Sequence, residues 1–211
     1  MKIAIVAPTR VGGGKIRSLA YKAFLESKNH SVTMLGFDED LTSKIWYFYQ
    51  RARRYLQKDK GWSRFLEKLA DRLERRIKQG KYDAVIGVET PHSYVLSRDL
   101  GCLKIFSWEA IGADQIYFNR FVNKTLDIEF VRRFREMELE ICKASDYVVF
   151  PWKTTENYVR KYIYDGNNFV TIKYGCNPKK RPVSYFFPVS IVSLGNIPFL
   201  PLHSLFVNYI N

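Results

Sequence analysis

Short apolar runs alternate with segments of helical spacing along most of this chain. Runs of strand length lie at residues 1–8, 31–37, 82–89, 103–108, 147–150 and 169–174. Helical spacing covers residues 16–27, 44–81, 125–144 and 154–162, and a further helix is expected to begin at Pro91-His92. Six strands that alternate with helices predict an α/β fold, a Rossmann-like doubly wound parallel sheet with helices on both faces.

The helical segments differ in how clearly they are marked. The clearest is 125–144, where Phe130, Phe134, Met137 and Ile141 recur at spacings of four, three and four. In 16–27, apolar residues also fall on one stripe of a helix: Leu19, Ala20, Ala23 and Phe24. Residues 111–124 show no regular pattern and are expected to be irregular.

A glycine-rich turn follows the first predicted strand. Gly12, Gly13 and Gly14 stand between that strand and a helical pattern that opens at Lys15. Such turns bring backbone N–H groups close to a phosphate, and Lys15 and Arg17 can reach the same anion. The spacing matches neither a dinucleotide fingerprint nor a Walker loop, and a plain flexible turn is the alternative.

Other candidate residues follow from where parallel strands end. In a doubly wound sheet the ligand crevice lies beyond the carboxyl ends of the strands. Glu89, His92 and Glu109 stand at such ends, and Glu109 is the candidate to orient a ligand hydroxyl or act as a base. The alternatives are an exposed loop carboxylate for each glutamate and a polar helix-start residue for His92. No metal site is expected, because the histidine has no cluster of Cys or His beside it.

Charge and cysteine content indicate what kind of partner the protein has and in which compartment it works. The chain of 211 residues carries a net charge of +13, which favours an anionic partner. Its three cysteines are far apart in sequence, as expected for reduced thiols in the cytoplasm. No signal peptide or spanning helix is expected, since the first apolar run stops at Pro8 and no run is long enough for a bilayer.

Most of the excess charge lies in residues 44–81. This stretch holds thirteen Lys or Arg against four Asp or Glu, interleaved with aromatic residues. Basic residues beside Trp and Tyr are typical of a helix in an anionic membrane interface. The candidate membrane-binding residues are Trp46, Arg51, Arg53, Arg54 and Trp62. The alternative is an amphipathic helix whose aromatic residues face the core; nucleic acid is disfavoured, because no nucleic-acid motif is present.

Several short motifs occur in a familiar order. After the opening strand and Gly12-Gly13 come Leu25 and the run Asn29-His30-Ser31-Val32, before the second strand. Cys142–Val149 contains a helix end and the strand after it, and Ile172–Asn177 leads out of the sheet. Ile191–Gly195 stands where a second domain would open. In combination these motifs resemble the amino-terminal, acceptor-binding domain of retaining GT-B glycosyltransferases of the glycogen synthase and phosphatidylinositol mannosyltransferase type.

The resemblance implies an enzyme that transfers a sugar from a nucleotide sugar to a membrane-associated or polyanionic acceptor. It implies a Rossmann-like acceptor domain over residues 1–182, and over 183–211 a linker with the start of a truncated donor domain. Family members hold the nucleotide sugar, their donor substrate, mainly in that second domain, so this chain alone is expected to be inactive. No cofactor is expected, and the partners are the nucleotide sugar, a lipid or glycan acceptor, and an anionic membrane surface.

The chain also departs from the family pattern. Many members carry a histidine after the fifth strand position of the first domain, where this sequence has Ser107-Trp108-Glu109. A serine usually follows the strand that here ends before Pro151-Trp152. The alternative is therefore a non-catalytic α/β module that docks an anionic membrane surface or a partner. In either case the expected location is the cytoplasm, with a peripheral position at the inner face of the membrane.

Overall fold

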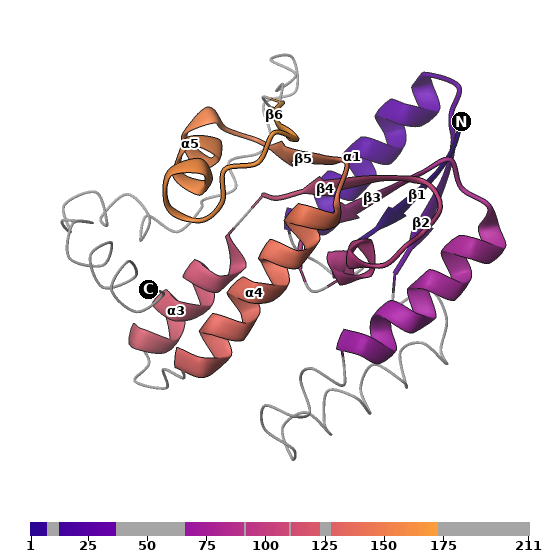
Figure 1. The fold of residues 1–211 in the computed structure, drawn as a ribbon. Coiled ribbons are helices and arrows are strands. Elements are labelled where there is room, and N and C mark those ends of the chain that lie inside the picture. The colour runs from indigo at the N-terminus through magenta and orange to yellow at the C-terminus, as the bar shows by residue number, and fades with distance from the viewer. Residues whose placement is uncertain (8–12, 37–65, 91, 110, 123–127, 173–211) are drawn as a thin grey trace. The chain divides into compact units, whose positions relative to one another are not determined.

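The computed structural model describes residues 1–7, 13–36, 66–90, 92–109, 111–122 and 128–172. The strands are β1 (Lys2–Val6), β2 (Ser31–Leu35), β3 (Ala84–Val88), β4 (Leu103–Ser107), β5 (Tyr147–Phe150) and β6 (Phe169–Thr171). The helices are α1 (Gly13–Ser27), a helix over 66–80, the 3₁₀ helix η1 (His92–Ser97), α3 (Gly112–Val122), α4 (Ile128–Ala144) and α5 (Lys153–Tyr162). Figure 1 shows their arrangement. The predicted second-domain segment and residues 37–65 lie outside the described residues.

The six strands form one sheet in the order β2-β1-β3-β4-β5-β6, and each adjacent pair is parallel. The predicted Rossmann-like doubly wound α/β fold is therefore confirmed. Strand β3 has no polar side chain because both of its faces are covered, and all five of its residues are buried.

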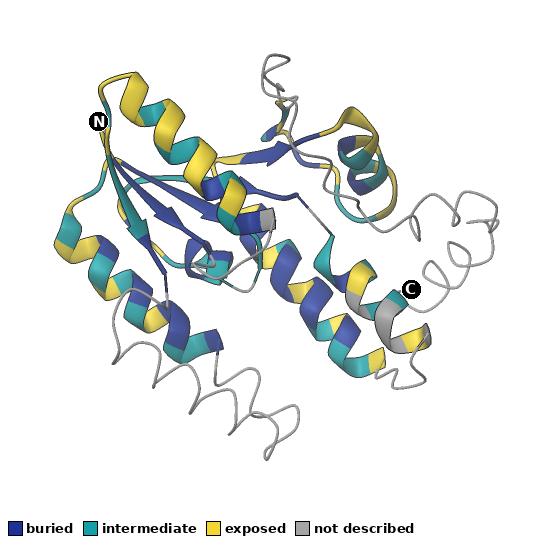
Figure 2. Cartoon of the chain, turned by 180° about the vertical axis from the view of Figure 1, so that it is seen from behind, coloured by how far each residue is buried: buried dark blue, intermediate teal, exposed yellow. Residues whose placement is uncertain are grey.

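Each face of the sheet has its own helices. On one face Ile5 and Ile86 belong to a core cluster against which Tyr21 and Leu25 of α1 pack; Figure 2 shows α1 lying across the strands on that side. On the opposite face lies Gly87, where an added Cβ would come within 2.7 Å of Leu96 of η1. The glycine therefore lets η1 approach the sheet closely, and α4 packs against η1.

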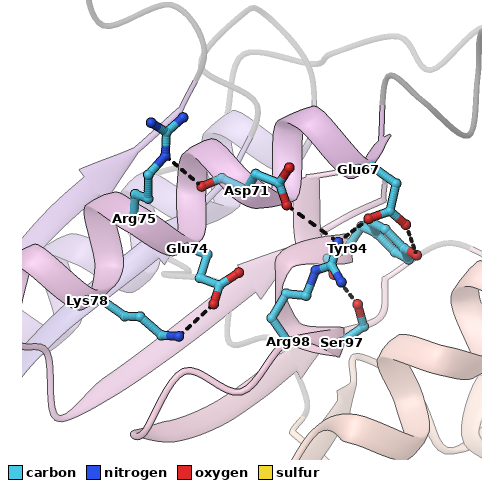
Figure 3. A network of polar contacts seen from close by, with 8 residues as sticks. All are labelled: Glu67, Asp71, Glu74, Arg75, Lys78, Tyr94, Ser97 and Arg98. Atoms are coloured by element: carbon cyan, nitrogen blue, oxygen red, sulfur yellow. Dashed lines mark hydrogen bonds and ion pairs between the residues drawn. The ribbon is translucent and has the colours of Figure 1, made fainter.

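Polar contacts join η1 to the helix over residues 66–80 (Figure 3). The Tyr94 hydroxyl donates to Glu67 at 3.0 Å, and Arg98 also pairs with Glu67. Arg98 lies 3.5 Å from Asp71 one turn further along the helix. Burial, followed by the charge of Glu140, raises the pKa of Tyr94 far above its usual range, so Tyr94 remains a hydrogen-bond donor at physiological pH. These bonds fix both elements on the same side of the sheet.

One predicted element is wrong. Residues 111–124 were expected to be irregular, but most of them form α3 (Gly112–Val122). Its first backbone N–H groups are capped by Glu138 of α4, since Gly112 N donates to Glu138 Oε1 at 2.7 Å and Ala113 N to Oε2 at 3.4 Å. A cap supplied from another helix leaves no local signal in the sequence.

Candidate functional site

The candidate site lies at the carboxyl edge of the sheet, around the ends of β1, β3 and β4. The chain leaves β1 toward β2 on one side and returns to β3 on the other, so β1 and β3 flank the topological switch point where doubly wound proteins bind ligands. The start of α1 and the residues after β3 and β4 meet there. The cluster defined by Gly14, Arg17, Glu89, Ser107 and Glu109 is called the edge cluster below.

Glu89 lies directly against the first turn of α1. A Cβ added at Gly14 would come within 2.6 Å of Cδ and Oε2 of Glu89, so only glycine fits there without moving the carboxylate. Glu89 has φ of +62°, a left-handed conformation that is strained for glutamate. Its carbonyl oxygen accepts from Ser93 N at 3.2 Å and from Ser93 Oγ at 2.7 Å, which hold this conformation at the start of η1.

The surroundings of Glu89 also affect its proton affinity. Partial burial raises the pKa of the Glu89 carboxyl above its ordinary value, and the Arg17 guanidinium lowers it in part. A carboxyl group with a raised pKa at a ligand edge is a candidate to accept or donate a proton, or to bind a hydroxyl.

Glu109 is held by two residues, Arg17 and Ser107, on the α1 face of the sheet. Arg17 forms an ion pair with Glu109 Oε2, and Ser107 Oγ donates to Oε1 at 2.9 Å. The Tyr21 hydroxyl lies 2.9 Å from Ser107 Oγ, which extends the chain of contacts along α1. Glu109 is 6 % exposed and so is a buried member of the cluster, which differs from the alternative of an exposed loop carboxylate.

Trp108 points the other way, as alternation along a strand requires. Its ring is buried between Phe106 and Phe150, with ring centroids 5.5 and 5.9 Å away. Its indole N–H donates to Glu138 Oε1 at 3.3 Å. Anchoring Trp108 in the core therefore directs both neighbouring residues, Ser107 and Glu109, toward α1.

A second buried polar group supports this loop from the opposite side. Glu138 accepts bonds from Trp108, Gly112, Ala113 and Arg135, and Arg135 also pairs with Asp114 of α3. Burial raises the pKa of Glu138 to about 7, although the Arg135 charge and the backbone donors oppose that rise. Glu138 was not among the predicted site residues. The signal in the sequence was a charged residue on the apolar stripe of α4.

The other predicted site residues are placed as follows. Gly13 and Lys15 lie in the first turn of α1, and His92 is the first residue of η1. Gly12 and the five candidate membrane residues, Trp46, Arg51, Arg53, Arg54 and Trp62, lie outside the described residues.

Among the residues that the structure describes, no group of three or more Cys, His, Asp or Glu side chains can hold a metal ion. Nor does any helix in that part of the chain have the length and apolar character to cross a bilayer.

A cavity of about 300 Å³ opens away from the edge cluster, between the helix over 66–80, η1 and α4. Its charged lining is largely paired: Glu67 binds Tyr94 and Arg98, and Glu129 binds Arg132 at 2.7 Å and Arg133 at 2.9 Å. These pairs make the lining a structural network, so we place the candidate site at the edge cluster.

Comparison of the chain with models of protein families, with curated proteins and with solved structures finds no match.

Proposed function

We propose that this chain is the acceptor-binding half of a retaining glycosyltransferase, with the edge cluster as the place where the acceptor sits. The observation that carries the proposal is the meeting of Arg17, Glu89 and Glu109 beside the glycine start of α1, at the switch point of the sheet. Since a fold of this kind serves many functions, the proposal rests on these side chains.

The chemistry of the cluster suits a phosphorylated or polyhydroxylated sugar. Carboxylates such as Glu89 and Glu109 accept hydrogen bonds from sugar hydroxyls, and an arginine binds a phosphate through a fork of N–H donors. The N–H groups at the start of α1 add a partial positive charge for the same anion. In this scheme Arg17 exchanges its pairing with Glu109 for the acceptor's phosphate.

Glu109 is the candidate to act on the acceptor hydroxyl. Its Oε1 is fixed by Ser107, which orients the carboxylate, and its Oε2 becomes available as Arg17 turns to the ligand. Glu89, whose pKa is raised by burial, supplies a second group that can hold a proton near the reacting hydroxyl. The nucleotide sugar is assigned to a second domain, as in the family that the sequence resembles.

Thermal unfolding with separate ligands tests this assignment. Glucose 6-phosphate and a malto-oligosaccharide are the acceptor probes, and UDP-glucose is the donor probe. A ligand at about 100 times its Kd stabilises the native state by about 2.7 kcal/mol, which raises Tm by several degrees. We expect an acceptor probe to give such a rise and UDP-glucose to give little.

Matched variants locate the binding. Arg17→Gln and Glu89→Gln remove cluster charges, whereas Arg133→Gln and Glu136→Gln remove charges of the same sign on α4. The ligand-induced rise in Tm should disappear in the first pair and persist in the second. Equal responses in both pairs, or no response of the unaltered protein to either acceptor probe, would contradict the assignment.

A further inference from the structure

Helix α1 turns an apolar stripe toward solvent. Ile16, Leu19 and Phe24 are 68 %, 48 % and 60 % exposed, and Ala20 and Ala23 between them are exposed as well. Their spacing of three and four residues places all five on one side of the helix. Figure 2 shows this exposed side of α1 facing away from the strands. The apolar stripe of α1 is therefore turned away from the core.

The inward side of α1 consists of other residues. Ser18 is buried and donates to Gly14 O, and Tyr21 and Leu25 are half-buried above the sheet. Because these residues already provide the packing of α1, the outward stripe contributes nothing to the core. An apolar helix face of this kind on the surface of a protein marks an interaction site.

Basic side chains border the stripe. Lys15 and Lys22 lie along one flank at the spacing of two helical turns, and Lys28 follows the last turn. The Lys28 ammonium lies 5.9 Å from the centroid of the exposed Phe24 ring. Glu26 is the one carboxylate of α1, and it lies 3.6 Å from Lys22. The border of the stripe is therefore positively charged, in a chain whose net charge is +13.

We infer that α1 lies on an anionic lipid surface, with Ile16, Leu19 and Phe24 in the acyl boundary and Lys15, Lys22 and Lys28 at the headgroups. A helix with an apolar face and bordering lysines binds in this way, because lysine stems extend along the apolar layer while the ammonium stays in water. The positive border distinguishes this occupant from an uncharged apolar protein surface. The residues of this stripe are not among residues 44–81, where the sequence predicts membrane contact.

The first arm of the test measures binding of the full chain to sedimented vesicles. We expect binding to vesicles of equal parts phosphatidylcholine and phosphatidylglycerol to be at least about tenfold stronger than to phosphatidylcholine alone. Raising salt from about 0.1 M to about 1 M shortens the Debye length from about 10 Å to about 3 Å and should weaken binding several-fold. Absence of binding to the mixed vesicles, or equal binding to both kinds, overturns the inference.

The second arm locates the contact. Leu19→Ser with Phe24→Ser removes two exposed apolar side chains and should weaken binding by about 10- to 100-fold. Phe121→Ser is the matched control, since Phe121 of α3 is 53 % exposed and apolar, and it should bind like the unaltered protein. Circular dichroism checks that each variant is folded.

Two other results would show that the lipid binds outside α1, or that the stripe of α1 binds something other than lipid. If Arg51→Gln, Arg53→Gln and Arg54→Gln together abolish binding while the α1 variant binds normally, the lipid contact does not involve α1. If sedimentation equilibrium shows a dimer that Leu19→Ser with Phe24→Ser dissociates, the stripe covers a second copy of the chain. Either result overturns the inference.

Discussion

Helices α1 and α4 carry similar apolar stripes in the sequence, but only the stripe of α4 is buried. In α4 the stripe is in the core, and its buried members include Val131, Phe134, Met137 and Ile141. In α1 the stripe of Ile16, Leu19 and Phe24 is exposed, while the residues turned to the sheet include glycine, serine and tyrosine. The two helices therefore attach to the same domain by different means.

The edge cluster explains part of this difference. The inward side of α1 must leave room for Glu89 at Gly14 and must present Arg17 to Glu109. Large apolar residues on that side would displace the carboxylates. Helix α4 does not contact the edge cluster along most of its length, so its apolar stripe can pack on η1 and α3. A periodic stripe thus predicts a helix, whereas the neighbours decide which side is buried.

The largest effect is expected from a substitution that disrupts the packing of α4. Phe134 is buried, and one of its ring atoms lies 2.7 Å from where a Cβ on Gly112 would stand. Phe134→Ala should lower the free energy of unfolding by about 3–5 kcal/mol, because truncation leaves a cavity that the surrounding helices fill only partly. Urea denaturation followed by circular dichroism measures this. A loss below about 1 kcal/mol would mean that the stripe of α4 does not support the fold.

The charged residue on the buried stripe of α4 gives the next largest effect. In the folded state, burial raises the pKa of Glu138 to about 7 from its ordinary value of 4.5. The folded protein therefore holds a proton that the unfolded chain releases between these pH values, and stability falls as pH rises from about 4.5 to about 7. At about 1.4 kcal/mol for each pKa unit, the loss is on the order of 3 kcal/mol.

Replacing Glu138 with Gln isolates that contribution. Glu138→Gln removes the titrating group, while groups with lowered pKa, such as Glu129 and Glu156, remain in both proteins. The free energy of unfolding of the unaltered protein minus that of the variant should decrease as pH rises from about 4.5 to about 7. Urea denaturation at several pH values measures the difference. A difference that does not change with pH would show that Glu138 is not protonated in the folded state.

A structural feature could be predicted from the sequence where the residues that determine it are close together in the chain. The strands of the sheet follow from apolar runs such as 82–89, and the edge position of Glu89 and Glu109 follows from parallel strands sharing one carboxyl edge. Helix α3 could not be predicted, because its cap is Glu138, which follows Gly112 by 26 residues.

The finer features of the edge cluster also depend on contacts between distant segments. The pairing of Arg17 with Glu109 and the approach of Glu89 to Gly14 join residues more than seventy positions apart. The exposed side of α1 follows from these contacts and not from its apolar period. The sequence therefore predicts which residues lie near the edge, and the fold determines how they pair.

A smaller effect tests the polar attachment of α1. Tyr21→Phe removes the hydroxyl that lies 2.9 Å from Ser107 Oγ and leaves the ring in place. The free energy of unfolding should fall by about 1 kcal/mol, the usual net value of a hydrogen bond. Tyr147→Phe is the control, since Tyr147 of β5 is exposed and its hydroxyl loss should change little. If both variants are as stable as the unaltered protein, apolar contacts such as those of Leu25 hold α1 in place.

The smallest expected effect tests the exposed side of α1 directly. Phe24→Ala should change the free energy of unfolding by no more than about 0.5 kcal/mol, the range for exposed positions. Alanine favours a helix more than phenylalanine does, and this gain offsets the lost contact of the ring with Lys28. The measurement is urea denaturation beside Phe134→Ala under the same conditions. A loss above about 2 kcal/mol for Phe24→Ala would mean that the ring is buried in the folded chain, and it would remove both the contrast between α1 and α4 and the lipid-facing surface inferred from it.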